Sequence, residues 1–218
     1  LLEAGPADRD PRIHTTSGYL ELWGSELDYR FSTPAQEGLG GRQMLINQGR
    51  VVGGSSSIHA MMVVRGNPRD YNGWNARGND GWAYEDVLPY FKRLENYDGG
   101  ASKWRGSNGP LAVRDCPDPH ARSAHFQEAA AELGYDGPGW DYNGARHEEG
   151  AGPLQFCITA DDQRASAATA YLHPARQRRT LTVATGARAT RVLFEGRRAV
   201  GVEYTRDGQT HQARAERE

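Results

Sequence analysis

The sequence predicts a mixed α/β fold, in which helices and strands both contribute, and three observations carry that prediction. Apolar residues recur at helical spacing between Tyr84 and Leu94. A second helical pattern runs from Ala124 to Leu133. From Thr180 onward the pattern changes to an alternation of apolar and polar residues, which is typical of half-buried strands.

The two helical stretches carry their own start and stop signals. Pro89 lies inside the first stretch and is tolerated best in the first turn of a helix, so we expect two short helices in succession. Ser123 can cap the second helix, Ala124–Leu133, and Gly134 marks its end. The apolar residues of this helix share one face, and they are Phe126, Ala129, Ala130 and Leu133.

The carboxyl-terminal part predicts a β-meander. We expect strands at residues 181–183, 189–194, 199–204 and 210–215, with tight turns at 195–197 and 206–208. At the other end, Leu1 and Leu2 are typical of the end of a buried strand. Residues 7–48 are rich in Gly, Pro and polar residues without sustained periodicity, which predicts a long excursion over the surface.

Composition and charge argue against several classes of function. The chain has 218 residues, 37% hydrophobic and 25% charged, with a net charge of -2, so neither nucleic acid nor an anionic membrane is an expected partner. No window approaches the roughly 18 apolar residues of a membrane span. Cys116 and Cys157 form no metal-binding or disulfide pattern, which predicts free thiols, no metal site and a cytoplasmic location.

The segment with most chemical content runs from Gly49 to Ala60. Gly53 and Gly54 allow the backbone to turn sharply and approach a ligand, and the serines Ser55–Ser57 can cap a following helix whose N–H groups favour an anion. A solvated Gly/Ser loop would have the same composition. Apolar residues on both sides favour a loop that is anchored in a core.

Glu3 supplies a second piece of a nucleotide site. An acidic residue that ends the second strand of a dinucleotide-binding βαβ unit accepts hydrogen bonds from ribose hydroxyls. Glu3 follows Leu1-Leu2 and therefore stands where such a residue is expected, although a glutamate that merely ends a strand would look alike.

Several motifs in order resemble the glucose-methanol-choline oxidoreductases. The stretch Gly49–Gly66, GRVVGGSSSIHAMMVVRG, resembles the first signature of that family. Further resemblances are LLEAGP at 1–6, GWAYEDVLPYF at 81–91, DYNG at 141–144, RASAATAYL at 164–172 and TGARATRVLF at 185–194. The resemblance covers nearly the whole chain.

The resemblance implies a partial FAD-binding, Rossmann-like domain with a β-meander, together with part of a substrate or cap region. It assigns residues 1–70, with the surface excursion 7–48, to the FAD-binding domain. Residues 71–160 are assigned to the substrate or cap region, and residues 161–218 return to the FAD-binding domain.

The resemblance also implies roles for single residues. Glu3 is expected to hold the adenosine ribose, and Val51 with the turn Gly53, Gly54 and Ser55 to lie along the cofactor. His59, Ala60, Met61 and Met62 are expected to pass beside the flavin ring, and the backbone of Ala189 to meet the adenine.

Two positions bear on how the flavin is held. The family usually has Asn where His59 stands, so the His59 side chain either takes part in the site or is a packed histidine satisfied by the backbone. Ile58 stands where some members attach the flavin covalently through histidine, and isoleucine cannot form that bond. The resemblance therefore implies non-covalent FAD.

The function implied by the resemblance is hydride transfer from a small-molecule alcohol to FAD, with an unspecified electron acceptor. The chain reads as an internal fragment, and the histidine base is expected outside it, so no residue here is assigned as catalytic. Two alternatives remain, a flavin-containing lyase of the hydroxynitrile lyase kind and a non-redox nucleotide-binding module. His120 and His125 are expected on the surface, and the tryptophans Trp23, Trp74, Trp82, Trp104 and Trp140 in the core.

Overall fold

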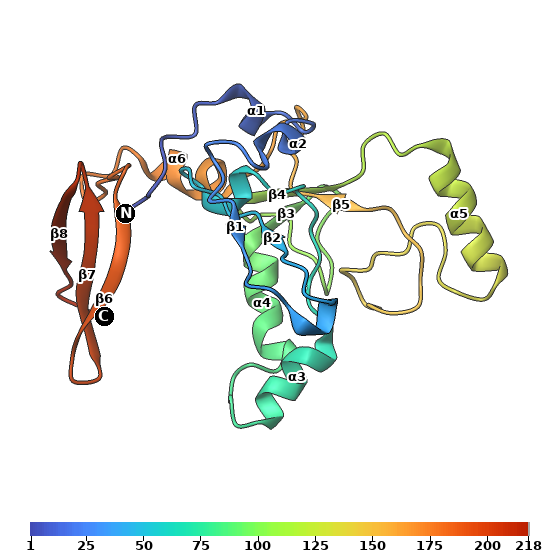
Figure 1. The fold of residues 1–218 in the computed structure, drawn as a ribbon. Helices are drawn as coiled ribbons and strands as arrows, with labels where there is room; N and C mark the ends of the chain where they lie inside the picture. The colour runs from blue at the N-terminus through green and yellow to red at the C-terminus, as the bar shows by residue number, and fades with distance from the viewer. Residues whose placement is uncertain (218) are drawn as a thin grey trace. The chain divides into compact units, whose positions relative to one another are not determined.

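The computed structural model describes residues 1–217, and the chain divides into two compact units (Figure 1). The first unit comprises Leu1–Ala60 and Ser166–Glu218, and the second comprises Met61–Ala165. Both units contain helices and strands, so the predicted mixed α/β class is confirmed.

The first unit consists of short helices, a two-stranded ribbon and a three-stranded sheet. Its elements are α1 (Pro11–His14), α2 (Tyr19–Leu22), β1 (Phe31–Ser32), the 3₁₀ helix η1 (Glu37–Leu39), β2 (Leu45–Ile46), the 3₁₀ helix η2 (Gly54–Ser57), the π-helix η3 (Ala168–Leu172), α6 (His173–Ala175), β6 (Arg188–Glu195), β7 (Arg198–Arg206) and β8 (Gln209–Arg214). Strands β1 and β2 pair antiparallel, and β6, β7 and β8 follow one another as an antiparallel meander.

The core of the first unit is apolar and draws on the stretch expected at the surface. Its members are Ile13, Leu22, Leu27, Val51 and Ile58, each at most 4% exposed. Three of them lie within residues 7–48, because α1 and α2 turn one side chain each inward. The surface excursion is therefore limited to the later part of that stretch, where β1, η1 and β2 contain no buried residue.

The amino terminus forms a short parallel ladder with residues 182–187. The Glu3 N–H donates to the Ala184 carbonyl, and the Ala187 N–H donates to the Glu3 carbonyl, both over 2.9 Å. Leu2 bridges Ala184, which matches the expected strand end, but residues 181–183 are not a strand. The reason is that residues 181–183 contribute only the Thr182 carbonyl, which accepts from the amino-terminal nitrogen, whereas the parallel bridge lies at Ala184.

The predicted β-meander is confirmed. Strands β6 and β7 extend at both ends beyond their predicted bounds, because the ladder continues into the turns, whereas β8 spans 209–214 and is shifted one residue toward the turn. Asp207 and Gly208 have φ of 51° and 74°, as a two-residue hairpin turn requires. The β6–β7 register shifts between Ala189 and Arg191, which marks a β-bulge.

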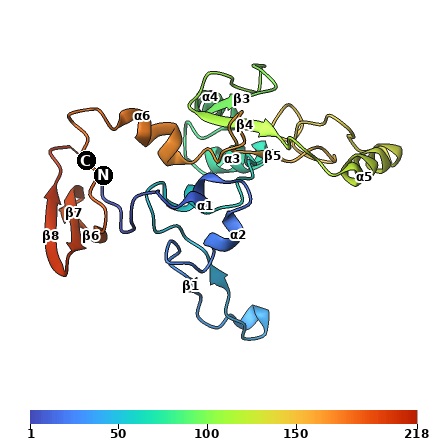
Figure 2. The same cartoon turned by 90° about the horizontal axis from the view of Figure 1, so that it is seen from above.

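The second unit contains three helices and a small mixed sheet. Its elements are α3 (Pro68–Ala76), α4 (Tyr84–Leu94), β3 (Glu95–Tyr97), β4 (Leu111–Asp115), α5 (Ala121–Glu132) and β5 (Gln155–Phe156). Strand β4 is central, parallel to β3 and antiparallel to β5. Within this unit, α5 lies away from α3 and α4 in both Figure 1 and Figure 2.

Two helix predictions are corrected. Tyr84–Leu94 is one helix with Pro89 inside it, not two short helices. The proline lacks one N–H, but the first turn is capped by Asp86, which accepts from the Ala83 N–H, and the helix continues. Helix α5 begins at Ala121 rather than Ala124, because the His120 ring and not Ser123 accepts the capping hydrogen bond. Gly134, with φ of 89°, follows its end as predicted.

The prediction for the tryptophans is wrong for three of them, whereas the prediction for the two histidines is confirmed. Trp23, Trp74 and Trp82 are 42–51% exposed, so these three do not fill the core. Trp74 and Trp82 pack edge to face against each other at the surface, with ring centroids 5.8 Å apart. His120 and His125 are exposed as predicted. Among residues 1–217, no helix is long and apolar enough to cross a membrane.

Candidate functional site

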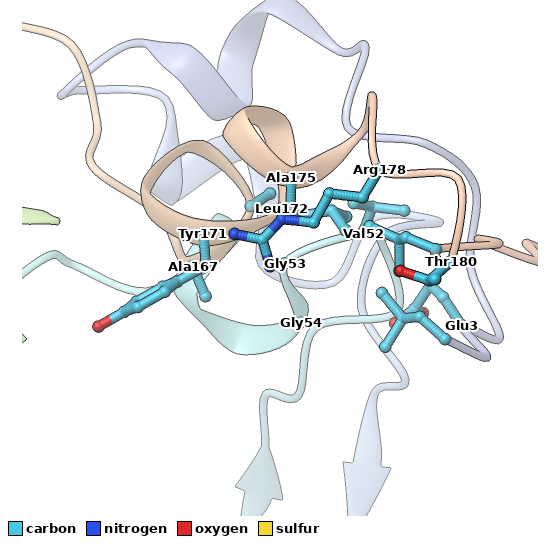
Figure 3. Close-up of a pocket in the computed structure, with 13 residues that line it drawn as sticks. Glu3, Val52, Gly53, Gly54, Ala167, Tyr171, Leu172, Ala175, Arg178 and Thr180 are labelled. Atoms are coloured by element: carbon cyan, nitrogen blue, oxygen red, sulfur yellow. The ribbon is translucent and has the colours of Figure 1, made fainter.

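One cavity of about 580 Å³ in the first unit brings predicted site residues together (Figure 3). Its walls come from the amino terminus, the turn before η2 and the segment that contains η3 and α6. The lining residues are Leu1, Glu3, Val52, Gly53, Gly54, Ala167, Ala168, Tyr171, Leu172, Ala175, Arg178, Thr180 and Leu181. Glu3 and the Gly53-Gly54 turn, about 50 residues apart in sequence, thus border one space.

Glu3 is held in place by its backbone and by its own carboxylate. The backbone is paired with residues 184 and 187, and the carboxylate Oε1 accepts from the Gly5 N–H over 2.7 Å. Burial raises the pKa of the Glu3 carboxyl, against the opposing effects of backbone hydrogen bonds and of the charge on Arg50. The side chain therefore reaches the cavity half-buried, with its orientation fixed.

The Gly53-Gly54 turn needs glycine for two different reasons. Gly53 has φ of 93°, and a Cβ there would lie 2.3 Å from the Ser57 Oγ and 3.2 Å from the Ala168 Cβ. Gly54 has φ of 58°, but a Cβ there would meet no atom within 4 Å. Gly53 is thus required by the fold, whereas Gly54 leaves open space at a cavity wall.

The serines of this run do not cap an α-helix, which corrects the sequence-based prediction. Residues 54–57 form a single 3₁₀ turn, which ends because the backbone of Ile58, with φ of -127°, leaves the helical region. The Ser57 Oγ donates to the Val52 carbonyl, and the Ser56 Oγ donates to the Gly53 carbonyl and accepts from the Ala167 N–H. The serines tie the turn to itself and to η3, and a turn of this length offers no helix terminus for an anion.

Other predicted site residues of the first unit lie outside the cavity lining. Val51 is fully buried in the apolar core, and the Ser55 Oγ bonds the Gly49 N–H and the Gln48 side chain. His59 and Ala60 are half-buried and follow η2 directly. Ala189 is exposed on β6, where it pairs with Tyr204 directly before the register shift.

Met61 and Met62 belong to the second unit. Met61 is 3% exposed with φ of 62°, a left-handed conformation that is uncommon for a residue with a side chain. Met62 is 54% exposed. Successive residues therefore point one inward and one outward.

Sequence reasoning missed part of the cavity. Arg178, Thr180 and Tyr171 line it, and Arg178 brings a positive charge to the same space as Glu3. The arginines at 176, 178 and 179 directly precede the segment that pairs with the amino terminus. This position next to the segment that pairs with Glu3 could have indicated a positive charge near the site.

The cavity residues have chemistry that suits part of a dinucleotide. A carboxylate at the end of the amino-terminal ladder can accept from ribose hydroxyls, and a glycine backbone with free space in front of it permits close approach. The guanidinium of Arg178 can pair with a phosphate. No group of three or more potential metal ligands occurs among residues 1–217.

Comparison with known proteins identifies the family. The family model described as GMC oxidoreductase matches residues 15–218. The chain belongs to the GMC oxidoreductase family. An oxygen-dependent choline dehydrogenase from Brucella anthropi is 46% identical over the whole chain, and the mitochondrial choline dehydrogenase of Homo sapiens is 41% identical.

Two solved structures have the same fold as this chain. A pyridoxine 4-oxidase from Mesorbium loti is 31% identical over 99% of this chain, with a TM-score of 0.88. An FAD-dependent oxidoreductase from Chaetomium thermophilum is 27% identical, also over 99% of this chain, with a TM-score of 0.86. The present chain covers 38–42% of the length of these four proteins.

Proposed function

We propose that the complete protein oxidises a small-molecule alcohol and that this chain supplies part of its non-covalent FAD site. The observation that carries the proposal is that Glu3 and the Gly53-Gly54 turn line one cavity in a chain of the GMC oxidoreductase family. FAD, when bound, supplies the hydride acceptor. The relatives named above are two dehydrogenases, an oxidase and an oxidoreductase, which favours redox chemistry over the lyase alternative.

In this proposal the residues of the first unit bind and orient the adenosine half of the cofactor. The Glu3 carboxylate accepts from the ribose hydroxyls, and the Gly54 backbone lies against the cofactor. Ala189, which is exposed on β6 beside the register shift, meets the adenine through its backbone. Val51 acts indirectly, since it anchors the turn in the apolar core.

The residues after the turn are proposed to lie beside the flavin. These are His59, Ala60, Met61 and Met62, with Ser55 holding the turn in shape through Gly49. Ile58 is 1% exposed in the apolar core and has no nucleophilic atom, which supports a flavin that is not covalently attached there. Residues 1–70 and 161–218 are then the FAD-binding part, and residues 71–160 contribute to the substrate or cap region.

The decisive variant is Gly54→Ala, because its added methyl group meets nothing in the chain itself. Gly24→Ala is the matched control, since Gly24 also has a positive φ, of 76°, with open space around it, and does not line the cavity. We expect Gly54→Ala to lower FAD content in the purified complete protein, while Gly24→Ala retains it. Both carry a backbone strain of about 1 kcal/mol, so the difference isolates the cavity.

Flavin reduction tests the reaction itself. Anaerobic addition of choline or simple primary alcohols to the complete protein should bleach the oxidised flavin absorbance. A protein that binds FAD but is reduced by no alcohol would contradict the oxidation, and equal FAD content in both glycine variants would contradict the assigned site. We also propose a cytoplasmic location, which the two free cysteines support. The proposal leaves the electron acceptor unspecified.

A further inference from the structure

Residues 61–65 are held by backbone hydrogen bonds to β5 and to the residue that follows it. The Met61 carbonyl accepts from the Cys157 N–H over 2.8 Å, and the Val63 N–H donates to the Gln155 carbonyl over 2.9 Å. Met62 bridges the same strand antiparallel. This segment therefore behaves as a short extra strand at the edge of β5, although its pairing is too brief to count as one.

The side chain of Asn143 forms further hydrogen bonds to the backbone of the same segment. Its Nδ2 donates to the Val63 carbonyl over 2.9 Å and to the Gln155 Oε1 over 2.7 Å. Its Oδ1 accepts from the Arg65 N–H over 2.7 Å. Asn143 is 0% exposed, so one buried amide uses both of its N–H groups and its oxygen on this cluster.

The position of Asn143 is itself fixed by its neighbours. Its N–H donates to the Asp141 Oδ1 over 3.0 Å, and its carbonyl accepts from the Arg65 Nη1 over 3.2 Å. Arg65 continues to Glu95 through a 2.6 Å ion pair whose two side chains are at most 5% exposed. A second group reaches the Val63 carbonyl, since the Tyr142 hydroxyl donates to it over 3.0 Å.

The fastened segment contains a strained residue and presents side chains outward. Met61 holds its φ of 62° while buried, and such a conformation persists only where the surroundings over-determine it. Met62 and Val64 are 54% and 69% exposed, while Met61 and Arg65 are buried. The hydrogen bonds on the inner side thus set where the outward side chains stand.

We propose that Asn143 is a positioning residue for the flavin, acting through the backbone of Val63 and Arg65. The inference rests on the proposed function, which assigns Met61 and Met62 to the flavin. Asn143 touches neither cofactor nor substrate in this role. It holds the outward face of residues 62–64 in one register, and a displacement of about 1 Å at a reacting centre costs on the order of a hundredfold in rate.

The test uses Asn143→Asp in the complete, FAD-loaded protein. Aspartate keeps the volume and the acceptor for the Arg65 N–H, but it places an oxygen against the Val63 and Gln155 oxygens. We expect kcat per bound flavin to fall about ten- to a hundredfold, with a shifted flavin absorbance maximum and midpoint potential. Lower pH should partly restore the rate, because a protonated carboxyl can again donate to the Val63 carbonyl.

Two further variants separate positioning from stability. Val113→Ala is the control, since Val113 is 1% exposed on β4 in the same unit and has no bond to residues 61–65. It should lower stability and leave kcat, KM and the flavin spectrum unchanged per bound flavin. Tyr142→Phe removes the other donor to the Val63 carbonyl, together with the acceptor of the Gln155 N–H. It should act in the same direction as Asn143→Asp, but less, because Asn143 still donates to Val63.

The outcomes are distinguishable from a failure of the proposed function. If the unaltered protein binds FAD that alcohols reduce, but Asn143→Asp and Tyr142→Phe behave like Val113→Ala, the positioning role is wrong and the proposed function stands. If Asn143→Asp does not fold, the spectrum and potential of Tyr142→Phe decide. An unaltered protein without FAD would overturn the proposed function and this inference together.

Discussion

The two units differ in the types of side chain at the centre of their cores. The first unit buries a cluster of aliphatic side chains around Leu22, Val51 and Ile58. The second also buries apolar side chains such as Val113 and Ile158, but its core contains an ion cluster. Glu95 accepts from Arg65 over 2.6 Å, from Arg105 over 3.0 and 3.1 Å, and from the Gly106 N–H over 2.7 Å. Burial lowers the pKa of Arg105, but the pairing with Glu95 more than offsets it, so the guanidinium stays charged.

This difference predicts how the free energy of unfolding of each unit responds to the substitution of a buried residue. Loss of an aliphatic group is graded, since its effect follows the volume removed and the ability of neighbours to relax. Loss of one buried charge is abrupt, because its partners stay buried without compensation. The second unit should thus depend more strongly on the identity of its buried residues than the first unit does. A buried ion pair is nevertheless weak evidence for greater total stability.

The largest effect is expected from Glu95→Gln. It leaves the guanidinium groups of Arg65 and Arg105 buried beside a neutral amide, so the second unit should lose about 3–5 kcal/mol of unfolding free energy. Hydrogen exchange in urea, followed separately in residues 61–165, measures it. Glu85→Gln on the exposed side of α4 is the control and should change little.

A comparable but graded loss is expected from Leu22→Ala. Leu22 is fully buried, and truncation should cost the first unit about 2–5 kcal/mol, with the lower part of that range favoured if short α1 and α2 relax into the space. Leu20→Ala, at a side chain 64% exposed, provides the comparison on the same helix. If Leu22→Met costs as much as Leu22→Ala, the expectation of a loss graded by the volume removed would be wrong.

A smaller effect should separate the neighbouring glycines. Gly53→Ala places a methyl group against Ser57 and should destabilise the first unit by roughly 1–3 kcal/mol. Gly54→Ala should cost only the strain of its positive φ, about 1 kcal/mol. Thermal unfolding of the FAD-free protein compares the two, and equal losses would mean that the crowding at Gly53 is relieved by a small shift.

The smallest effect concerns pH at Glu3. Because the pKa of its carboxyl is raised in the folded state, the folded chain binds the proton more tightly than the unfolded chain. Its contribution to stability is therefore present at low pH and is lost as pH rises from the ordinary value near 4.5 through the raised one. FAD affinity should follow the opposite course, since the ionised carboxylate accepts from the ribose. Glu3→Gln should remove both dependences, which titration of flavin binding against pH can measure.

Local patterns were sufficient for elements whose stabilisation is local. The Asp207-Gly208 turn and the alternation around it determine the meander, since the turn residues supply the positive φ and the alternation supplies one apolar face. Gly134 likewise stops α5. The boundary predicted at Ser123 was wrong because the His120 ring accepts the capping hydrogen bond, and local sequence does not rank such competitors. The break predicted at Pro89 was wrong because the helix continues through the proline in spite of its missing N–H.

The sequence by itself determined the mixed α/β class, the meander, the special role of the Gly53-Gly54 turn and, through its ordered motifs, the family. Only the tertiary structure decided that Glu3 and this turn share a cavity with Arg178, and that Asn143 reaches Val63 across about 80 residues. It also decided that Arg65, Glu95 and Arg105 lie inside. The physical reason is that charged and amide groups are placed in a core only where all their partners meet, and those partners come from distant parts of the chain.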